Sequence, residues 1–177
     1  MARGNTRERI QQVAKELFIA QGVQRTSLQE IADRLGITKP ALYYHFDSRE
    51  ELVRSIIVPL LDDGRDYLAT VETDGETDAR ALLGGFFDFH YKHRDILMLA
   101  VREMTTLADL GLLETVTSWR ERLGELLVGE DASLAARVRA VVALGGLADC
   151  AWAFSDVPAD ELRPVAVDAA LSTLGLS

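Results

Sequence analysis

Residues 28–46 read LQEIADRLGITKPALYYHF, and this stretch decides the fold. Its first half carries an apolar stripe at helical spacing and stops at Gly36, after which Thr38 can cap a second helix of about residues 39–45. Glycine permits the left-handed backbone of a tight turn, and the small side chain of Ala32 lets two helices cross closely. The stretch therefore predicts a helix-turn-helix, whose second helix fits the major groove of DNA.

Two more helices flank this motif. Apolar residues recur at helical spacing over residues 7–21, and Gly22 is placed to end that helix. Ser27 and Ser48 each stand three residues before a glutamate, in the pattern of a capping box that opens a helix. The second box predicts a longer helix over about residues 49–69.

Pro59 lies inside that longer helix. Proline has no amide to bond the Ser55 carbonyl four residues earlier, so we expect a kink or a break there. Residues 70–78 are polar and lack apolar periodicity, which predicts a loop. The body then continues as helices near residues 78–93, 95–107, 109–128, 132–155 and 160–174.

The fold class follows from this helical periodicity. No stretch alternates polar and apolar residues in the way of a half-buried strand, so the sequence predicts an all-α fold. The short helices form an N-terminal three-helix head over residues 1–48, which contains the helix-turn-helix. The remaining residues, 49–177, form a larger helical body.

Charge is unevenly distributed over the 177 residues. The net charge is −9, yet residues 1–55 carry +2 and residues 56–177 carry −11. A basic head on an acidic body permits a nucleic-acid surface at the head. The single cysteine cannot form an internal disulfide, and the sequence has neither an apolar run of membrane length nor a signal peptide. These features predict a cytoplasmic protein.

Hydrogen-bond donors gather on and around the second helix of the motif. Hydroxyl, ammonium and imidazole groups at such positions bind phosphate oxygens and set the register on DNA. Thr38, Lys39 and Ala41 are best placed to meet base edges, and the free amides beside Ser27 favour a further phosphate. The candidate DNA-binding residues are Ser27, Thr38, Lys39, Ala41, Tyr43, Tyr44, His45 and Arg49.

The aromatic residues of this segment have a structural alternative. Tyr43 and Tyr44 are adjacent and must face different ways on a helix, so we expect one to pack and the other to face phosphate. Phe46 follows the helix and is expected to lock it in the core against Phe18.

Residues 28–46, followed by SREEL at 48–52, resemble the DNA-binding head of the TetR family of transcriptional regulators. The detailed similarity covers about residues 7–55. It implies a three-helix head, a connecting fourth helix, and a body for ligand binding and dimerisation whose last two helices form the dimer. It also implies a regulator that binds a palindromic operator as a homodimer, most often a repressor that a small-molecule ligand releases.

The large apolar side chains of the body are candidates for a ligand pocket, because pockets between helices are mostly apolar with a few polar groups. His90 and His93 stand three residues apart, a spacing that two metal ligands on one helix can share, but a metal site needs more ligands than two. We therefore expect no metal and no cofactor. The candidate ligand-binding residues are Phe86, Phe89, His90, Met98 and Trp119, although at helical spacing the same side chains can simply form core.

Two apolar stripes mark the last two helices as a dimer surface. Small residues in both stripes let helices approach closely, and four such helices from two chains make a bundle. The alternative is that the stripes face the core of the same chain. The candidate interface residues are Leu134, Val138, Val141, Gly145, Ala148 and Trp152 in one stripe and Leu162, Ala166, Ala169 and Thr173 in the other.

Two other classes of function compete with a DNA-binding regulator. The sequence has no nucleophile with its base, no phosphate-binding loop and no metal signature, so an enzyme is not expected. A protein-interaction module that uses the helix-turn-helix fold without DNA is the alternative. Salt separates the two, because binding to phosphates weakens steeply as the salt concentration rises.

Overall fold

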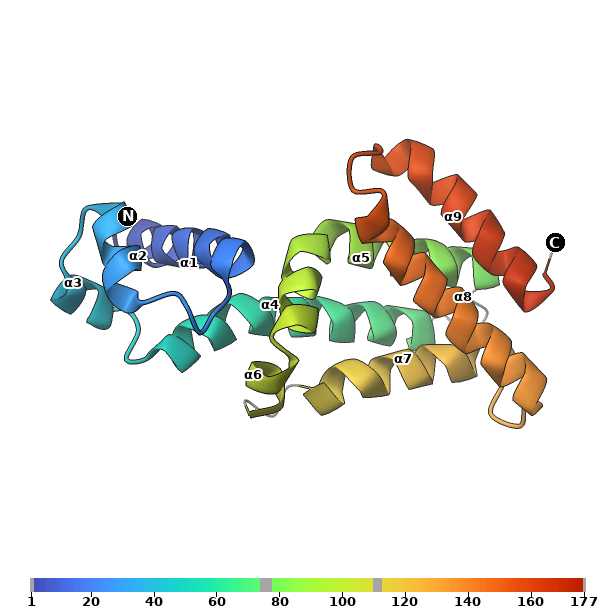
Figure 1. Cartoon of the computed structure of the whole chain (residues 1–177). Coiled ribbons are helices and arrows are strands. Elements are labelled where there is room, and N and C mark those ends of the chain that lie inside the picture. Colours follow the sequence, from blue (N-terminus) through green and yellow to red (C-terminus); the bar gives the residue numbers. More distant parts are fainter. Residues whose placement is uncertain (1, 74–77, 110–112, 177) are drawn as a thin grey trace. The chain divides into compact units, whose positions relative to one another are not determined.

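The computed structural model describes residues 2–73, 78–109 and 113–176. Within these ranges the chain is helical and has no strand, which confirms the all-α prediction (Figure 1). In the same ranges, no helix is both long enough and apolar enough to span a bilayer. The helices are α1 (Ala2–Gln21), α2 (Leu28–Leu35), α3 (Lys39–Tyr43), α4 (Arg49–Thr73), α5 (Ala79–Arg102), α6 (Met104–Asp109), α7 (Leu113–Val128), α8 (Leu134–Ala153) and α9 (Ala159–Leu174).

Packing divides the chain into two compact units. The first unit joins residues 1–60 to residues 95–113, and the second joins residues 61–94 to residues 114–177. Each of α4 and α5 therefore contributes residues to both units. The predicted boundary between residues 48 and 49 separates a DNA-binding domain from a ligand-binding and dimerisation domain. It is a boundary between functions, and it stays a prediction.

The C-terminal end of α5 completes the first unit. Arg102 Nη1 donates to the Ile19 carbonyl at 3.2 Å, in the last turn of α1, where carbonyls lack helical partners. Glu103 Oε1 accepts from the Val23 amide at 3.0 Å, just after α1 ends. The end of α1 is thus stabilised by two residues that lie 83 and 80 positions further along the chain.

The helix ends of the head form as the sequence predicts. Gly22 follows α1 with a φ of +90°, and Gly36 follows α2 with a φ of +66°. The Gly36 amide bonds the Asp33 carbonyl, and the Ile37 amide bonds the Ala32 carbonyl. This pair of bonds is a Schellman motif, and it turns the chain from α2 toward α3.

The two predicted capping boxes form only in their first half. The Ser27 hydroxyl accepts from the Glu30 amide at 3.1 Å, and the Glu51 amide donates to the serine hydroxyl three residues earlier at 3.0 Å. The Glu30 carboxylate does not return to its own cap, because the side-chain amide of Gln21 donates to it at 2.9 Å. The Glu51 carboxylate accepts from the Asp47 amide at 2.6 Å, one residue before the expected donor.

α4 is longer and more continuous than the sequence predicts. It passes through Pro59 and includes residues 70–73, which were expected to lie in a loop, while residues 74–77 lie outside the described part. The sequence predicted a kink or a break at Pro59, and the helix does not break there. The Ser55 carbonyl, which proline leaves without a helical donor, accepts from the Gln11 side chain at 3.1 Å.

α5 also continues where a break was predicted, at residues 93–95. These residues are His93, Arg94 and Asp95, none of which is a glycine or proline, so they can remain in a helix. The interruption comes instead between α5 and the short α6. The limits of α8 and α9 agree with the prediction to within a few residues.

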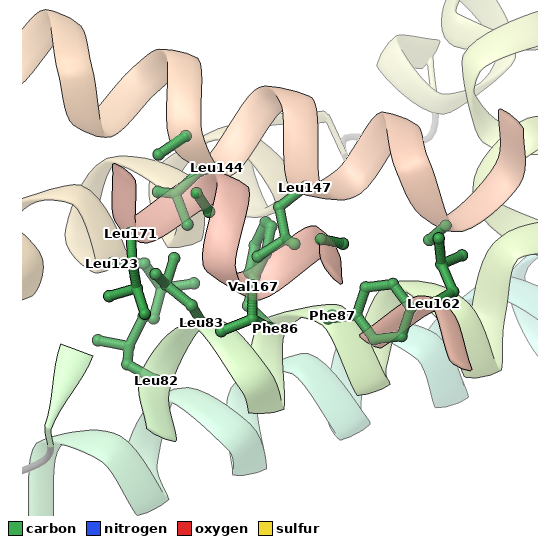
Figure 2. Close-up of a cluster of buried hydrophobic side chains, with 14 of the residues drawn as sticks. Leu82, Leu83, Phe86, Phe87, Leu123, Leu144, Leu147, Leu162, Val167 and Leu171 are labelled. Carbon is green, nitrogen blue, oxygen red and sulfur yellow. The ribbon is translucent and has the colours of Figure 1, made fainter. Parts of the chain in front are cut away.

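The core of the second unit lies where α5, α8 and α9 meet (Figure 2). Phe86 and Phe87 of α5 are buried together with Leu144 and Leu147 of α8 and with Val167 of α9. Burying an aliphatic or aromatic side chain of this size contributes about 1.5–3 kcal/mol relative to leaving it in water. α8 and α9 therefore pack as a pair and present one shared apolar face to α5.

Candidate nucleic-acid interface

The recognition helix α3 is anchored on one side and open on the other. Leu42 is fully buried and holds the helix against the head, whereas Lys39, Tyr43 and Tyr44 are exposed. Thr38 begins the helix, because its hydroxyl oxygen accepts from the Ala41 amide at 3.3 Å. The helix ends at Tyr43, two residues before the predicted end.

Neither tyrosine lies in the core, and Tyr43 is the more covered of the two. Tyr43 is 41% exposed and Tyr44 is 66% exposed, while Phe46 is fully buried, as is Phe18. The Lys39 ammonium lies 5.8 Å from the centre of the Tyr43 ring, and the Tyr44 ring meets the His45 ring edge-on at 5.4 Å. α3 and the two residues that follow it thus present a cation, two hydroxyls and an imidazole.

Arg49 supports the turn between α1 and α2. Its Nη1 lies 3.2 Å from the Val23 carbonyl oxygen, 3.3 Å from that of Gln24 and 3.4 Å from that of Thr26. A guanidinium that binds three carbonyls of one turn fixes the backbone of that turn. The structure therefore gives Arg49 a positioning role, and its contact with phosphate stays a prediction.

Arg7 is a residue of this site that the sequence did not reveal. Its Nη1 donates to the His45 carbonyl at 2.6 Å, its guanidinium carbon lies 4.2 Å above the Phe46 ring, and its Nη2 lies 3.6 Å from Glu51 Oε1. Arg7 thereby secures the segment that follows the recognition helix. It stands on the polar side of α1, where apolar periodicity carries no signal.

The predicted dimer stripe of α8 is largely exposed. Leu134 is 76% exposed and Val141 is 64% exposed, and Val138 and Trp152 are also open to solvent. The opposite side of the helix, which includes Leu144 and Leu147, is buried. α8 thus has two apolar faces, of which one packs in its own unit and the other is available to a partner.

Half of the residues predicted for the dimer stripe of α9 lie on the buried side of the helix, so the prediction was wrong for them. Leu162 and Ala166 are buried in the core of the second unit, so they are not available for a surface contact. Ala169 is exposed and Thr173 is half-buried. Val165, which the predicted stripe does not include, is 68% exposed. Both sides of α9 are apolar, so the spacing alone did not distinguish them.

The five candidate ligand residues do not lie in one packed unit. Met98 belongs to the first unit, and Phe86, Phe89, His90 and Trp119 belong to the second. Phe86 is buried in the core cluster, as its structural alternative predicted. A groove of about 770 Å³ between α7 and α8 is lined by other residues, namely Arg120, Glu121, Gly124, Glu125, Val128, Gly129, Glu130, Arg137, Ala140, Val141 and Leu144.

His90 lies against two aromatic side chains of its own helix, Phe86 and Phe89. Its ring lies 4.1 Å from that of Phe86 and 5.3 Å from that of Phe89. Burial lowers the pKa of His90 to about 4, although the bond to the Phe86 carbonyl acts in the opposite direction. Because a carbonyl can only accept, Nδ1 carries the proton of the 2.9 Å bond to Phe86, and Nε2 of the neutral ring is an acceptor.

His90 and His93 form hydrogen bonds with different groups. His93 Nε2 lies 2.9 Å from Asp63 Oδ2, which also accepts from Lys92 at 2.6 Å. Over the described ranges, no group of three or more His, Cys, Asp or Glu side chains is arranged to hold a metal.

A capped helix-turn-helix, an exposed polar face on its second helix and a separate helical unit define a DNA-binding regulator of the helix-turn-helix class. The family model described as bacterial regulatory proteins, tetR family, matches residues 10–56. The transcriptional repressor KstR2 of Rhodococcus jostii is 31% identical over 153 residues, which cover 79% of this chain and 73% of that protein. The chain belongs to the TetR family of transcriptional regulators, which are not enzymes.

Two further comparisons bear on the head and on the fold. The transcriptional activator FasR of Mycolicibacterium smegmatis is 37% identical over 79 residues, which cover 43% of this chain and 36% of that protein. That similarity therefore spans about a third of the relative's length. The ketosteroid transcriptional regulator KstR2 of Mycobacterium tuberculosis has the same fold, with a TM-score of 0.72, 19% identity and coverage of 96% of this chain and 93% of that one.

Proposed function

We propose that the protein is a homodimeric repressor that binds a palindromic operator in the cytoplasm and is released by a small-molecule ligand. The exposed polar face of α3 carries the proposal. Lys39 and Tyr43 of the helix and Tyr44 just after it reach solvent, while the buried Leu42 fixes the helix on the head. An exposed row of donors on an anchored helix suits recognition in the major groove.

The two ends of the recognition segment have different tasks in this proposal. The start of α3, with Thr38, Lys39 and Ala41, meets base edges, because N-terminal residues of a recognition helix point into the groove. Residues around it hold phosphates and set the register. The phosphate-binding group comprises Ser27, Tyr43, Tyr44, His45 and Arg49.

A second copy of the chain covers the exposed stripe of α8. An apolar row as open as Leu134, Val138 and Val141 marks an interaction surface, since burial contributes about 25 cal/mol per Å² of apolar area. A twofold interface uses the same patch on both chains, and Ala169 and Val165 of α9 extend it. Two heads then meet half-sites about 34–36 Å apart, which is one turn of DNA.

The effector site is proposed for the second unit. Of the five candidate residues, Phe89, His90 and Trp119 lie there outside the buried core cluster, and His90 offers a neutral acceptor to a ligand that donates a hydrogen bond. The ligand must prefer the conformation that misfits the operator. A shift from 1:99 to 99:1 between two states requires roughly 5.5 kcal/mol of differential binding.

The direction of regulation is part of the proposal. KstR2 of Rhodococcus jostii is named a repressor, and its similarity covers most of both chains, whereas FasR, named an activator, is similar over a shorter stretch. A reporter gene behind the operator tests the direction. Repression predicts that transcription rises when the gene for this protein is deleted.

Operator binding is tested with the purified protein on fragments from upstream of its own gene. We expect a protected inverted repeat and an affinity that falls steeply as salt rises. Lys39→Ala should weaken binding and lower the salt slope by roughly one unit, because one phosphate or base contact of a cation is lost. Lys15→Ala, on α1 and outside the candidate site, is the matched control and should leave the slope unchanged.

The protein-interaction alternative predicts a different result. A folded dimer that binds none of the fragments, nor any site from a random-sequence selection, would contradict operator binding. A partner whose affinity is insensitive to salt and to Lys39→Ala would support the alternative.

A further inference from the structure

Pro59 leaves one backbone acceptor of α4 without a donor from its own helix. In a regular α-helix, the amide of residue 59 would donate to the Ser55 carbonyl, but proline has no amide hydrogen. α4 nevertheless continues as a helix as far as Thr73. A carbonyl inside the protein that lacks a donor is costly, so its partner has to come from elsewhere.

The donor comes from α1. Gln11 Nε2 donates to the Ser55 carbonyl at 3.1 Å, and both residues are half-buried. The Ser55 hydroxyl donates to the Leu52 carbonyl at 2.7 Å, so the side chain of Ser55 is directed into its own helix. The bond therefore joins a side chain of the first helix to the backbone of the fourth, 44 positions away.

A second polar contact between these two helices is weaker. Arg7 Nη2 lies 3.6 Å from Glu51 Oε1, and both side chains are more than two-fifths exposed. Exposed ion pairs of this length contribute little to stability. The Gln11 bond is shorter and less exposed, so it defines the position of α1 along α4 more closely.

We propose that Gln11 and Pro59 act together as positioning residues for operator binding. The proline frees the Ser55 carbonyl, the glutamine occupies it, and the bond fixes α1 at one position on α4. α1 carries Arg7, which holds the segment after α3, so a fixed α1 also fixes the recognition helix. The functional part of the proposal, that this bond supports operator binding, rests on the proposed function. The structural part, that the bond fixes α1 on α4, does not depend on it.

A double-mutant cycle tests the structural part in the full chain at one protein concentration. Gln11→Ala should lower the equilibrium constant for folding about tenfold, because the Ser55 carbonyl loses its donor. In a Pro59→Ala background the amide of residue 59 can donate to that carbonyl, so Gln11→Ala should then cost less than about twofold. Equal costs in the two backgrounds would overturn the proposal.

Operator affinity tests the functional part. Gln11→Ala should weaken binding several-fold with an unchanged salt slope, because no phosphate contact is removed. Gln12→Ala is the matched control, since Gln12 is exposed and bonds Glu16 on its own helix at 2.9 Å. It should change neither stability nor affinity by more than about twofold.

The possible failures are distinguishable. If the unmutated protein binds no operator, the proposed function fails, while the unfolding cycle still reports on the Gln11–Ser55 bond. If the cycle shows coupling but operator affinity is unchanged by Gln11→Ala, the bond stabilises the head and the positioning role is wrong.

Discussion

At the scale of single residues, His90 makes stability depend on pH. Its pKa is about 4 in the folded protein and about 6.5 in the unfolded chain, so the unfolded state binds more protons between these values. The contribution to stability is complete above pH 6.5 and is lost as the pH falls toward 4. The loss amounts to roughly 3 kcal/mol at most.

His90→Asn isolates this effect, because the asparagine amide can still donate to the Phe86 carbonyl and does not titrate in this range. We expect the difference in unfolding free energy between the two proteins to change with pH between 6.5 and 4 and to be constant above 7. A difference that does not vary with pH would mean that the pKa of His90 is the same in the folded and unfolded states.

At the scale of elements, α9 separates a core face from a surface face at adjacent residues. Ala166 is buried against the core cluster, whereas Val165 is exposed. Ala166→Asp should therefore destabilise the second unit by several kcal/mol, because an unpaired charge is buried. Val165→Asp should cost less, because its charge stays in water within the unit and can weaken only the proposed dimer contact. Thermal unfolding followed by circular dichroism compares the two variants. Equal losses of thermal stability would contradict the assignment of Ala166 to the core face and Val165 to the surface face.

The same elements indicate how much the sequence could predict. Caps and turns of the head were predictable, because Gly22, Gly36 and Thr38 act through local backbone chemistry. The position of the core face on α9 was not, since both sides of the helix are apolar. The bond from Gln11 to the Ser55 carbonyl of α4 crosses 44 positions, and no local sequence pattern predicts it. The contacts of Arg7 and Arg49 with distant carbonyls were hidden for the same reason.

At the scale of the whole molecule, the proposed dimer links the mass of the protein in solution to its affinity for the operator. Val141→Asp puts a charge in the exposed stripe of α8, where each copy would meet its partner. We expect a folded monomer by light scattering and a loss of operator affinity of at least 100-fold, because one half-site contact remains. Thr70→Asp, at an exposed position of α4, should remain dimeric. A Val141→Asp dimer would place the interface elsewhere.

The discontinuous first unit has a consequence for how the protein is made. Arg102 and Glu103, which bond the end of α1 and the turn after it, leave the ribosome about 80 residues later than their partners. Domains generally fold as units, so the first unit is complete only after the chain has been synthesised past residue 95. A chain interrupted before residue 95 therefore carries the whole helix-turn-helix sequence and still lacks the two contacts that α5 and the residue after it make with the end of α1 and the turn that follows.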